Sequence, residues 1–452
     1  MAATASLVVA EAFDALAARG SAFRIECRTT LSSLTRDIGR FVMTSPAPSA
    51  SDLVDREHRQ SGTKRTTLSR QASFWVSAGV VAHTLWTSAA PAMVYRLYAQ
   101  TWDLSHATTG AIYAVYPVVV MAVLIGFGDL SDHFGRRATM LMGLAASFLG
   151  VLMFAVAPSV AWLLIGRALM GVGVGLSAGP SSAALVDFAP LGNAKRAGST
   201  NNAAQAFGFT AALIIGGALT QYGPIPMHLS FWVLLAAIAG LFVAAWFLPR
   251  DGRMTELAWR PMLPNLPYEA RKPFVVAAVA VACAYSHGPL VLSLGGQVAH
   301  DLIGSSNAFV GALALSVFAI TSAAVGIAAR STPYRRSITA GAIAAPMAMA
   351  VLALSVERHA LPIFLLAMMI AGVGYSLLFL GGLELVNSIA PAGQRGGVLS
   401  ALYLVGYLFQ GLIAMTLGQI ATVRGLASAI DIGAIVVAAL GFATLCALPP
   451  KP

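Results

Sequence analysis

Residues 128–137 read Gly128-Asp-Leu-Ser-Asp132-His-Phe-Gly135-Arg136-Arg137 and lie between two long apolar blocks, near 108–128 and 138–157. About 20 mostly apolar residues are long enough to cross the hydrocarbon core of a bilayer as a helix. The short charged stretch is therefore typical of a tight loop at a membrane surface. Gly135 suits a turn with positive φ, and the two arginines stay charged at any physiological pH.

The composition of the whole chain agrees with a membrane protein. Of its 452 residues 58% are hydrophobic and only 10% are charged, with a mean hydropathy of +0.76. Soluble proteins carry about 25% charged residues, so the apolar excess must face lipid, and we expect the bilayer to be a partner. The net charge of +10 does not indicate nucleic-acid binding, because the basic residues lie in short gaps between apolar blocks.

Twelve apolar blocks predict twelve transmembrane helices. They lack the alternation of membrane β-strands, and backbone groups in lipid must be satisfied within the segment, so we predict an all-α integral membrane protein. The blocks lie near 74–95, 108–128, 138–157, 160–184, 197–219, 228–248, 273–295, 306–329, 337–355, 361–386, 396–420 and 426–448.

Basic residues predict the orientation. They concentrate in the gaps after every second span, whereas the other gaps hold only Arg96, Arg358 and Arg424. The positive-inside rule places the basic gaps, and with them both termini, in the cytoplasm of a multi-pass plasma (inner) membrane protein. The basic gaps contain Arg136, Arg137, Lys195, Arg196, Arg250, Arg253, Arg260, Arg271, Lys272, Arg330, Arg335, Arg336 and Arg395.

The division into segments follows from the spans. We expect a cytoplasmic tail at 1–73, six-helix bundles at 74–248 and 273–448, a cytoplasmic loop between them at 249–272, and a short end at 449–452. The tail is polar and favours a flexible segment. A weak amphipathic helix at 9–24 and a translation start at Met43 are alternatives for it.

The two halves resemble each other, which indicates an internal duplication. Pro91 and Pro289, and likewise Arg137 and Arg335, match at an offset of 198 residues, and Gly171-Val-Gly173 and Gly372-Val-Gly374 match at 201. A nearly constant offset over several spans is the signature of a repeat. Two parallel halves with a binding site between them are an established plan for transporters.

The loop at 128–137 resembles the signature G-x-x-x-D-x-x-G-R-R of the major facilitator superfamily, a family of transporters with two pseudo-symmetric six-helix bundles; the resemblance covers 74–448. It implies a conformational gate, for which we expect the residues Gly128, Asp132, Gly135, Arg136, Arg137 and Asp187. In this family Asp132 is expected to meet the helix start near Gly396 and Gly397, where the helix dipole favours a carboxylate. Asp187, at the end of span four, is a candidate partner for an arginine of the loop.

Two further stretches resemble family motifs only in part. Leu163 to Gly173 resembles L-x-x-x-R-x-x-Q-G-x-G, with Met170 in place of glutamine, and the resemblance implies a role of Arg167 in proton coupling. The alternative is an arginine that extends outward to the membrane surface. Span five carries Ala212-Leu213 where drug and proton antiporters of the family have Gly-Pro, which weakens the case for drug export.

Polar residues inside spans are the default candidates for a site. His83, His287 and Glu384 are candidates for proton coupling alongside Arg167, because histidine titrates near neutral pH; a structural role for each histidine, and pairing of Glu384 with a basic residue such as Arg395, stay open. For the substrate cavity we expect Tyr113, Asn201, Gln205, Tyr285, Tyr375, Tyr403 and Tyr407. Few charged residues lie among these candidates, which favours a largely apolar or weakly polar solute.

We therefore predict a monomeric secondary transporter of a small organic solute that works by alternating access, exports amphipathic compounds and is driven by the proton gradient. Proton-coupled uptake is the alternative, and a scaffold or membrane enzyme is the third reading. The sequence contains no P-loop, HExxH, GxSxG or metal-ligand cluster, so we expect no enzymatic activity, no cofactor and no metal, and no nucleic-acid partner.

Overall fold

The computed structural model describes residues 67–127, 130–190, 194–250, 271–302, 304, 307–389 and 395–448. It leaves undescribed the side chains of residues 132, 194–195, 301–302, 395–397 and 400. All regular elements in this part of the chain are helical, as the sequence predicts for a chain surrounded by lipid. The tail at 1–66, with the candidate start at Met43, and most of the loop at 249–272 lie outside the described residues.

The helices of the first half follow the predicted spans closely. The elements are α3 (Arg70–Ala89), η1 (Ala90–Met93), α4 (Tyr95–Thr101), α5 (His106–Phe127), α6 (Leu130–Phe134), α7 (Arg136–Ala155), α8 (Val160–Phe188), α9 (Ala194–Tyr222) and α10 (Leu229–Trp246). Gly135, directly before α7, has a φ of 82°, a conformation that suits glycine and lets the chain turn sharply between α6 and α7.

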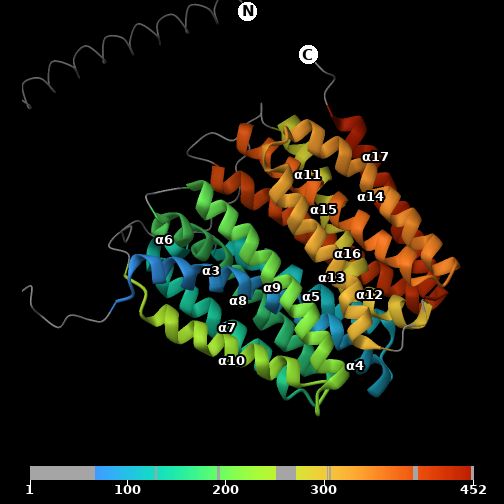
Figure 1. Ribbon diagram of the computed structural model, residues 1–452, viewed down its shortest axis with the longest axis horizontal. Coiled ribbons are helices and arrows are strands. Elements are labelled where there is room, and N and C mark those ends of the chain that lie inside the picture. The colour runs from blue at the N-terminus through green and yellow to red at the C-terminus, as the bar shows by residue number, and fades with distance from the viewer. Residues whose placement is uncertain are drawn as a thin grey trace, which may run out of the picture. The chain divides into compact units, whose positions relative to one another are not determined.

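The second half repeats this order (Figure 1). Its elements are α11 (Arg271–Tyr285), η4 (Pro289–Ser293), α12 (Gly295–Gln297), η5 (Val298–Leu302), α13 (Ala308–Ala328), η6 (Ala329–Ser331), α14 (Tyr334–Glu357), α15 (Leu361–Ile389), α16 (Arg395–Arg424) and α17 (Leu426–Ala447). The predicted and observed ends differ by only a few residues.

Eleven helices in the described part of the chain are long and apolar enough to cross a membrane. The twelfth predicted span corresponds to α3, which has 20 residues but is not among the eleven. The reason is visible in its buried face, which carries the polar residues Ser73, Ser77, His83, Thr84 and Thr87. These side chains lower the mean hydropathy of α3 while pointing into the protein rather than into lipid.

The first helix of each half is broken at the matched prolines. Pro91 lies in η1, between α3 and α4, and Pro289 begins η4, after α11. A proline ring removes a backbone donor and interrupts a regular helix. The internal repeat is therefore visible in the structure, because each half begins with a helix that changes direction near one end of the molecule.

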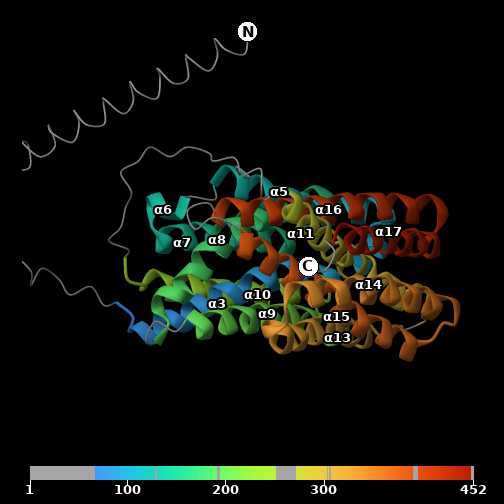
Figure 2. The same ribbon diagram turned by 90° about the horizontal axis from the view of Figure 1, so that it is seen from above.

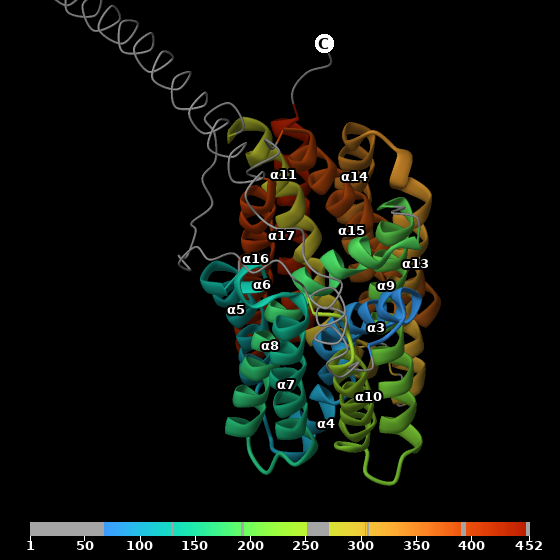
Figure 3. The same cartoon turned by 90° about the vertical axis from the view of Figure 1, so that its left-hand side faces the viewer.

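The two halves contact each other mainly along two helix pairs, α5 with α16 and α9 with α13, which lie on opposite sides of the molecule (Figures 2 and 3). Gly110 allows close approach on the first, since a Cβ there would lie 2.6 Å from the carbonyl oxygen of Ala414. On the second, the Ala308 amide donates to Gln221 Oε1 at 2.8 Å. These contacts gather near the start of α5, which we call the His106 end. The opposite end, where α7 begins, is the Arg136 end.

Replacement of Gly110 by valine should separate the halves at the His106 end, because the new methyl groups would collide with backbone atoms of α16. The rings of Tyr222 and Phe309, whose centroids are 5.9 Å apart across the other helix pair, provide a reporter. With cysteines at positions 222 and 309, Gly110→Val should lower the yield of a short bifunctional cross-linker several-fold.

The matched control is Gly126→Val on the same helix, where a Cβ would meet no atom within 4 Å. An unchanged cross-linking yield in Gly110→Val, with the control also unchanged, would show that the α5–α16 contact does not hold this end closed.

Candidate functional site

Arg167 is a fully buried cation in the middle of the first half. Its side chain is 0% exposed, so the alternative that it extends to the membrane surface is wrong. Nη1 donates to the Ser88 carbonyl at 3.1 Å and Nη2 to the Tyr113 carbonyl at 3.5 Å. The guanidinium also lies over the rings of Tyr116, at 4.5 Å, and Tyr113, at 5.6 Å. Carbonyl dipoles and ring faces therefore stabilise its charge.

The ring of Tyr113 connects this cation to the second half. Gln410 Nε2, on α16, donates a hydrogen bond to the Tyr113 hydroxyl. Gly288 leaves room for this pair, since a Cβ there would lie 3.0 Å from Gln410 Nε2 and 3.1 Å from the Tyr113 hydroxyl. The contact joins α5, α16 and the break after α11 at one point between the halves.

A cluster of aromatic rings lies beside this point, and we call it the aromatic wall: Tyr285, Tyr375, Phe379, Tyr403 and Tyr407. The rings of Tyr285 and Tyr407 meet edge to face at 5.4 Å, and those of Tyr375 and Phe379 stack at 6.1 Å. All five side chains are only partly buried. Four of the predicted cavity residues are therefore brought together.

The two histidines in the spans differ in their surroundings. His83 has both ring nitrogens engaged within the first half, Nδ1 with the Val80 carbonyl at 2.8 Å and Nε2 with the Ser147 hydroxyl at 3.0 Å. His287 is 0% exposed, and its Nδ1 lies 3.1 Å from the Cys283 carbonyl. Its Nε2 is buried and has no hydrogen-bond partner among the described residues. These contacts indicate a structural role for His83.

The Arg136 end contains an ion pair between Arg136 and Asp187. The pair joins the start of α7 to the end of α8, and Arg70 adds hydrogen bonds from its guanidinium to the carbonyls of Asp187 and Ala189, each at 3.0 Å. Arg137 lies 5.7 Å from the centre of the Trp246 ring. Gly128, the side chain of Asp132 and the expected contact near Gly396 and Gly397 lie outside the described residues.

The remaining candidates do not join the central cluster. Asn201 Oδ1 lies 2.9 Å from the Ser182 hydroxyl, which ties α9 to α8 within the first half. Gln205 is partly buried on α9, near its start. Glu384 is exposed on α15, and the side chain of Arg395, its possible partner, is not described.

Sequence reasoning missed two residues of the cluster, Phe379 and Ser88. Phe379 follows Tyr375 at a spacing of four, so helical spacing would have identified it, whereas Gln410 and Tyr116 are polar residues inside predicted spans and belong to the default candidates. No sequence pattern points to Ser88, whose carbonyl accepts from Arg167 because of how α3 packs against α8.

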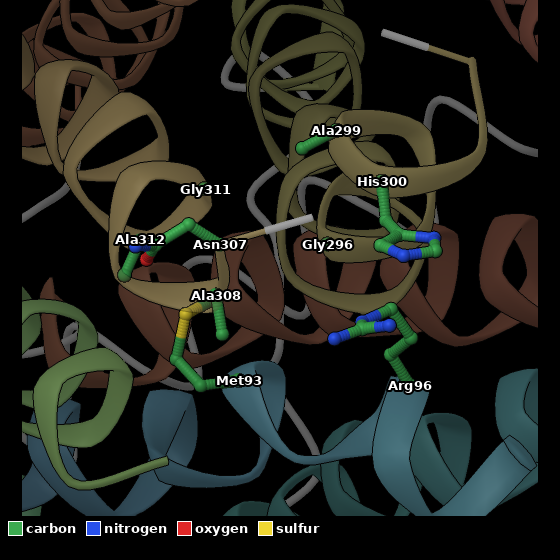
Figure 4. A pocket seen from close by; sticks show the side chains of 9 residues that line it. All are labelled: Met93, Arg96, Gly296, Ala299, His300, Asn307, Ala308, Gly311 and Ala312. Atoms are coloured by element: carbon green, nitrogen blue, oxygen red, sulfur yellow. The ribbon is translucent and has the colours of Figure 1, made fainter. Parts of the chain in front are cut away.

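A small pocket at the His106 end is lined by residues of both halves (Figure 4). Arg96, on α4, and His300, on η5, point toward each other, and Met93 and Ala308 form the other side. Nearby, His106 Nδ1 and Gln297 Oε1 form a hydrogen bond between the halves. In the described part of the chain, hydrogen bonds and close packing between the halves hold this end together.

Ser147→Ala should destabilise the protein by about 0.5–2 kcal/mol, because it leaves His83 Nε2 buried without its partner. The free energy of unfolding in detergent measures the effect. Ser177→Ala is the matched control, since Ser177 is equally buried, lies on the facing helix α8, and its hydroxyl has no hydrogen-bond partner. Equal losses for the two variants would contradict the role assigned to the His83–Ser147 bond.

Three curated relatives share part of this sequence. The inner membrane transport protein YajR of Escherichia coli K12 is 28% identical over 148 residues, which cover 32% of each chain. The class B tetracycline resistance protein of Escherichia coli is 27% identical over 33% of this chain and 37% of its own, and the glucose transporter GlcP of Staphylococcus epidermidis is 29% identical over 30% and 32%. The aligned stretches thus span about a third of the length of these relatives.

The fold and the family are shown by two further comparisons. The crystal structure of the nucleoside transporter NupG (D323A mutant) superposes with a TM-score of 0.68 over 84% of this chain and 100% of that chain, at 12% sequence identity. The sequence profile of the Major Facilitator Superfamily matches residues 75–415. This match covers the signature loop, the first half, most of the second half and the Tyr113–Gln410 contact, and the protein therefore belongs to the Major Facilitator Superfamily of membrane transporters.

Proposed function

We propose that this protein exports small amphipathic organic compounds across the plasma membrane in exchange for protons. The observation that carries the proposal is the Tyr113–Gln410 hydrogen bond between the halves, which lies beside the partly exposed aromatic wall. A site at the contact of two pseudo-symmetric halves is reached from either side when the halves rock.

The orientation follows from the basic residues, which place the Arg136 end in the cytoplasm. With that orientation, the contacts at the His106 end lie on the external side. The relative named as a tetracycline resistance protein supports export.

Proton-coupled uptake is the second candidate function. The relative named as a glucose transporter favours it, and so does the absence of the Gly-Pro pair at positions 212 and 213, where this chain has Ala-Leu. The two candidates differ in the direction of proton flow relative to the solute, since an antiporter moves protons against the solute and a symporter moves both together.

His287 is our candidate for the proton-binding group. Its Nδ1 is engaged by backbone carbonyls, whereas Nε2 is buried and has no hydrogen-bond partner among the described residues, so a proton can be accepted there. The position also directly precedes the break at Pro289, where binding of a charge would act on a conformationally variable segment.

In proteoliposomes containing a pH-sensitive dye, a solute gradient should drive protons in the opposite direction, and His287→Gln should abolish this pH change while solute exchange at zero gradient continues. The control is His359→Asn, which changes an exposed histidine in the turn after α14. Proton flow in the same direction as the solute would identify uptake by symport. Movement of no solute from a broad panel would contradict transport itself.

Asp187→Asn should slow transport several-fold, because the ion pair with Arg136 orders the loop that we propose as a gate. The two side chains are 48% and 30% exposed, so the loss in unfolding free energy should stay below about 1 kcal/mol. The charge swap Arg136→Asp with Asp187→Arg should restore part of the rate.

Asp431→Asn is the control for this variant, since it removes an exposed carboxylate on α17, away from the loop. Wild-type transport by Asp187→Asn at normal membrane insertion would exclude a gating role for the ion pair.

A further inference from the structure

The interior of the protein carries a positive charge without a carboxylate to balance it. Arg167 is the only Lys, Arg, Asp or Glu among the buried side chains that the structure describes. Its hydrogen-bond acceptors are two backbone carbonyls, and its Nε has no hydrogen-bond partner. Dipoles and ring faces stabilise a cation locally but carry no net negative charge, so the electrostatic potential around it stays positive.

No acidic residue in the described spans reaches this charge. Described carboxylates lie at Asp103, Asp187, Glu357, Glu384 and Asp431, and each is near the end of a helix or on an exposed position. The ion pair of Arg136 with Asp187 lies at the Arg136 end. A buried arginine is costly in a membrane interior and usually marks a functional site.

The positive potential extends to the aromatic wall. The Tyr113 ring lies 5.6 Å from the guanidinium carbon of Arg167, and its hydroxyl accepts a hydrogen bond from Gln410, three residues after Tyr407 on α16. Charge interactions decay slowly with distance where no water intervenes. A solute against Tyr285 and Tyr407 therefore experiences the charge of Arg167 without having to touch it.

The aromatic wall indicates the shape of the solute. Tyr375 and Phe379 present nearly parallel rings, and Tyr285 and Tyr407 present edge and face. Flat rings stack on such surfaces or pack edge to face against them, which adds to the gain from apolar burial. The Tyr113 hydroxyl and the Gln410 amide place hydrogen-bonding groups at the margin of the wall.

We propose that the transported solute is a planar aromatic molecule that carries one negative charge, bound by the aromatic wall and attracted by Arg167. This inference rests on the proposed transport function. Neutral aromatic compounds bind more weakly at this site, and aromatic cations are disfavoured by the same charge. The proposal thus assigns Arg167 the role of a specificity-determining residue that acts through the electrostatic potential of the site.

The test compares three probes with one ring system on the full-length protein: indole-3-acetate, indole-3-acetamide and tryptamine, which are an anion, a neutral molecule and a cation. We expect the anion to bind about tenfold more tightly than the amide, because charges interact strongly in a low-dielectric interior, and the cation to bind most weakly. Binding is measured by saturation-transfer NMR in detergent. Phenylacetate should also bind more tightly than cyclohexylacetate, which has the same charge but no flat ring.

Variants separate the charge from the wall. Arg167→Gln should remove the preference for the anion and leave amide binding unchanged, Arg167→Lys should keep the preference, and Tyr375→Leu should weaken all three indole probes. Arg96→Gln is the control, because it removes a partly exposed arginine that is hydrogen-bonded to Gln100. If Arg167→Gln does not fold, the charge series on the wild-type protein still decides the question.

Equal binding of tryptamine and indole-3-acetate by the wild-type protein, binding of none of the probes, or an anion preference that survives in Arg167→Gln would overturn the inference. Counterflow in proteoliposomes distinguishes a wrong solute class from failure of the proposed transport function. If neutral or cationic solutes are exchanged and anions are not favoured, the transporter function stands and the assigned solute class is wrong. If no solute is exchanged, the transport function itself fails.

Discussion

Polar groups that are surrounded by lipid must find their partners inside the protein, and most of this structure follows from that constraint. The backbone satisfies it by forming helices throughout the described chain. Buried hydroxyls satisfy it by bonding to carbonyls three or four residues earlier, as Ser77, Ser286 and Ser316 do. The charged side chains that the structure describes lie near helix ends or on incompletely buried positions with one exception, Arg167, which is held by carbonyls and tyrosine rings. The exception falls beside the contact between the halves, where a transporter has its site.

The two halves have the same order of helices but carry different polar and aromatic side chains at their centre. Both begin with a helix broken at a matched proline, Pro91 or Pro289. The first half contains the buried cation and the ion pair at the Arg136 end. The second half contains the aromatic wall, and its counterpart of the signature loop has Arg330 in the position of Asp132. Duplication thus preserved the backbone while the side chains at the centre diverged, which is expected when one solute must be held asymmetrically.

The fold was predictable because it depends on long, strongly apolar segments, whose ends differ from the observed helices by only a few residues. The signature loop and the repeat made the two-bundle plan predictable as well. The site was predictable in part, since Tyr285, Tyr375, Tyr403 and Tyr407 lie on helices expected to line the centre. Contacts between the halves, such as Gln410 with Tyr113 or His106 with Gln297, join residues far apart in the chain. They depend on the rotation of each helix about its axis, which average hydropathy does not determine.

The interactions at the His106 end affect how easily such a protein can alternate between two states. Among the described residues, the His106 end is held by the His106–Gln297 and Ala308–Gln221 hydrogen bonds and by close helix packing at Gly110 and Gly217. Each neutral bond contributes on the order of 1 kcal/mol, and opening this end exposes its groups to water that replaces those bonds. A strong buried ion pair across the halves would instead favour the closed state by several kcal/mol. A solute could reverse that preference only by binding the other state more tightly by the same free energy. In the proposed alternating-access mechanism, closure by such hydrogen bonds keeps the two states close in free energy, so that binding of a small solute shifts their populations.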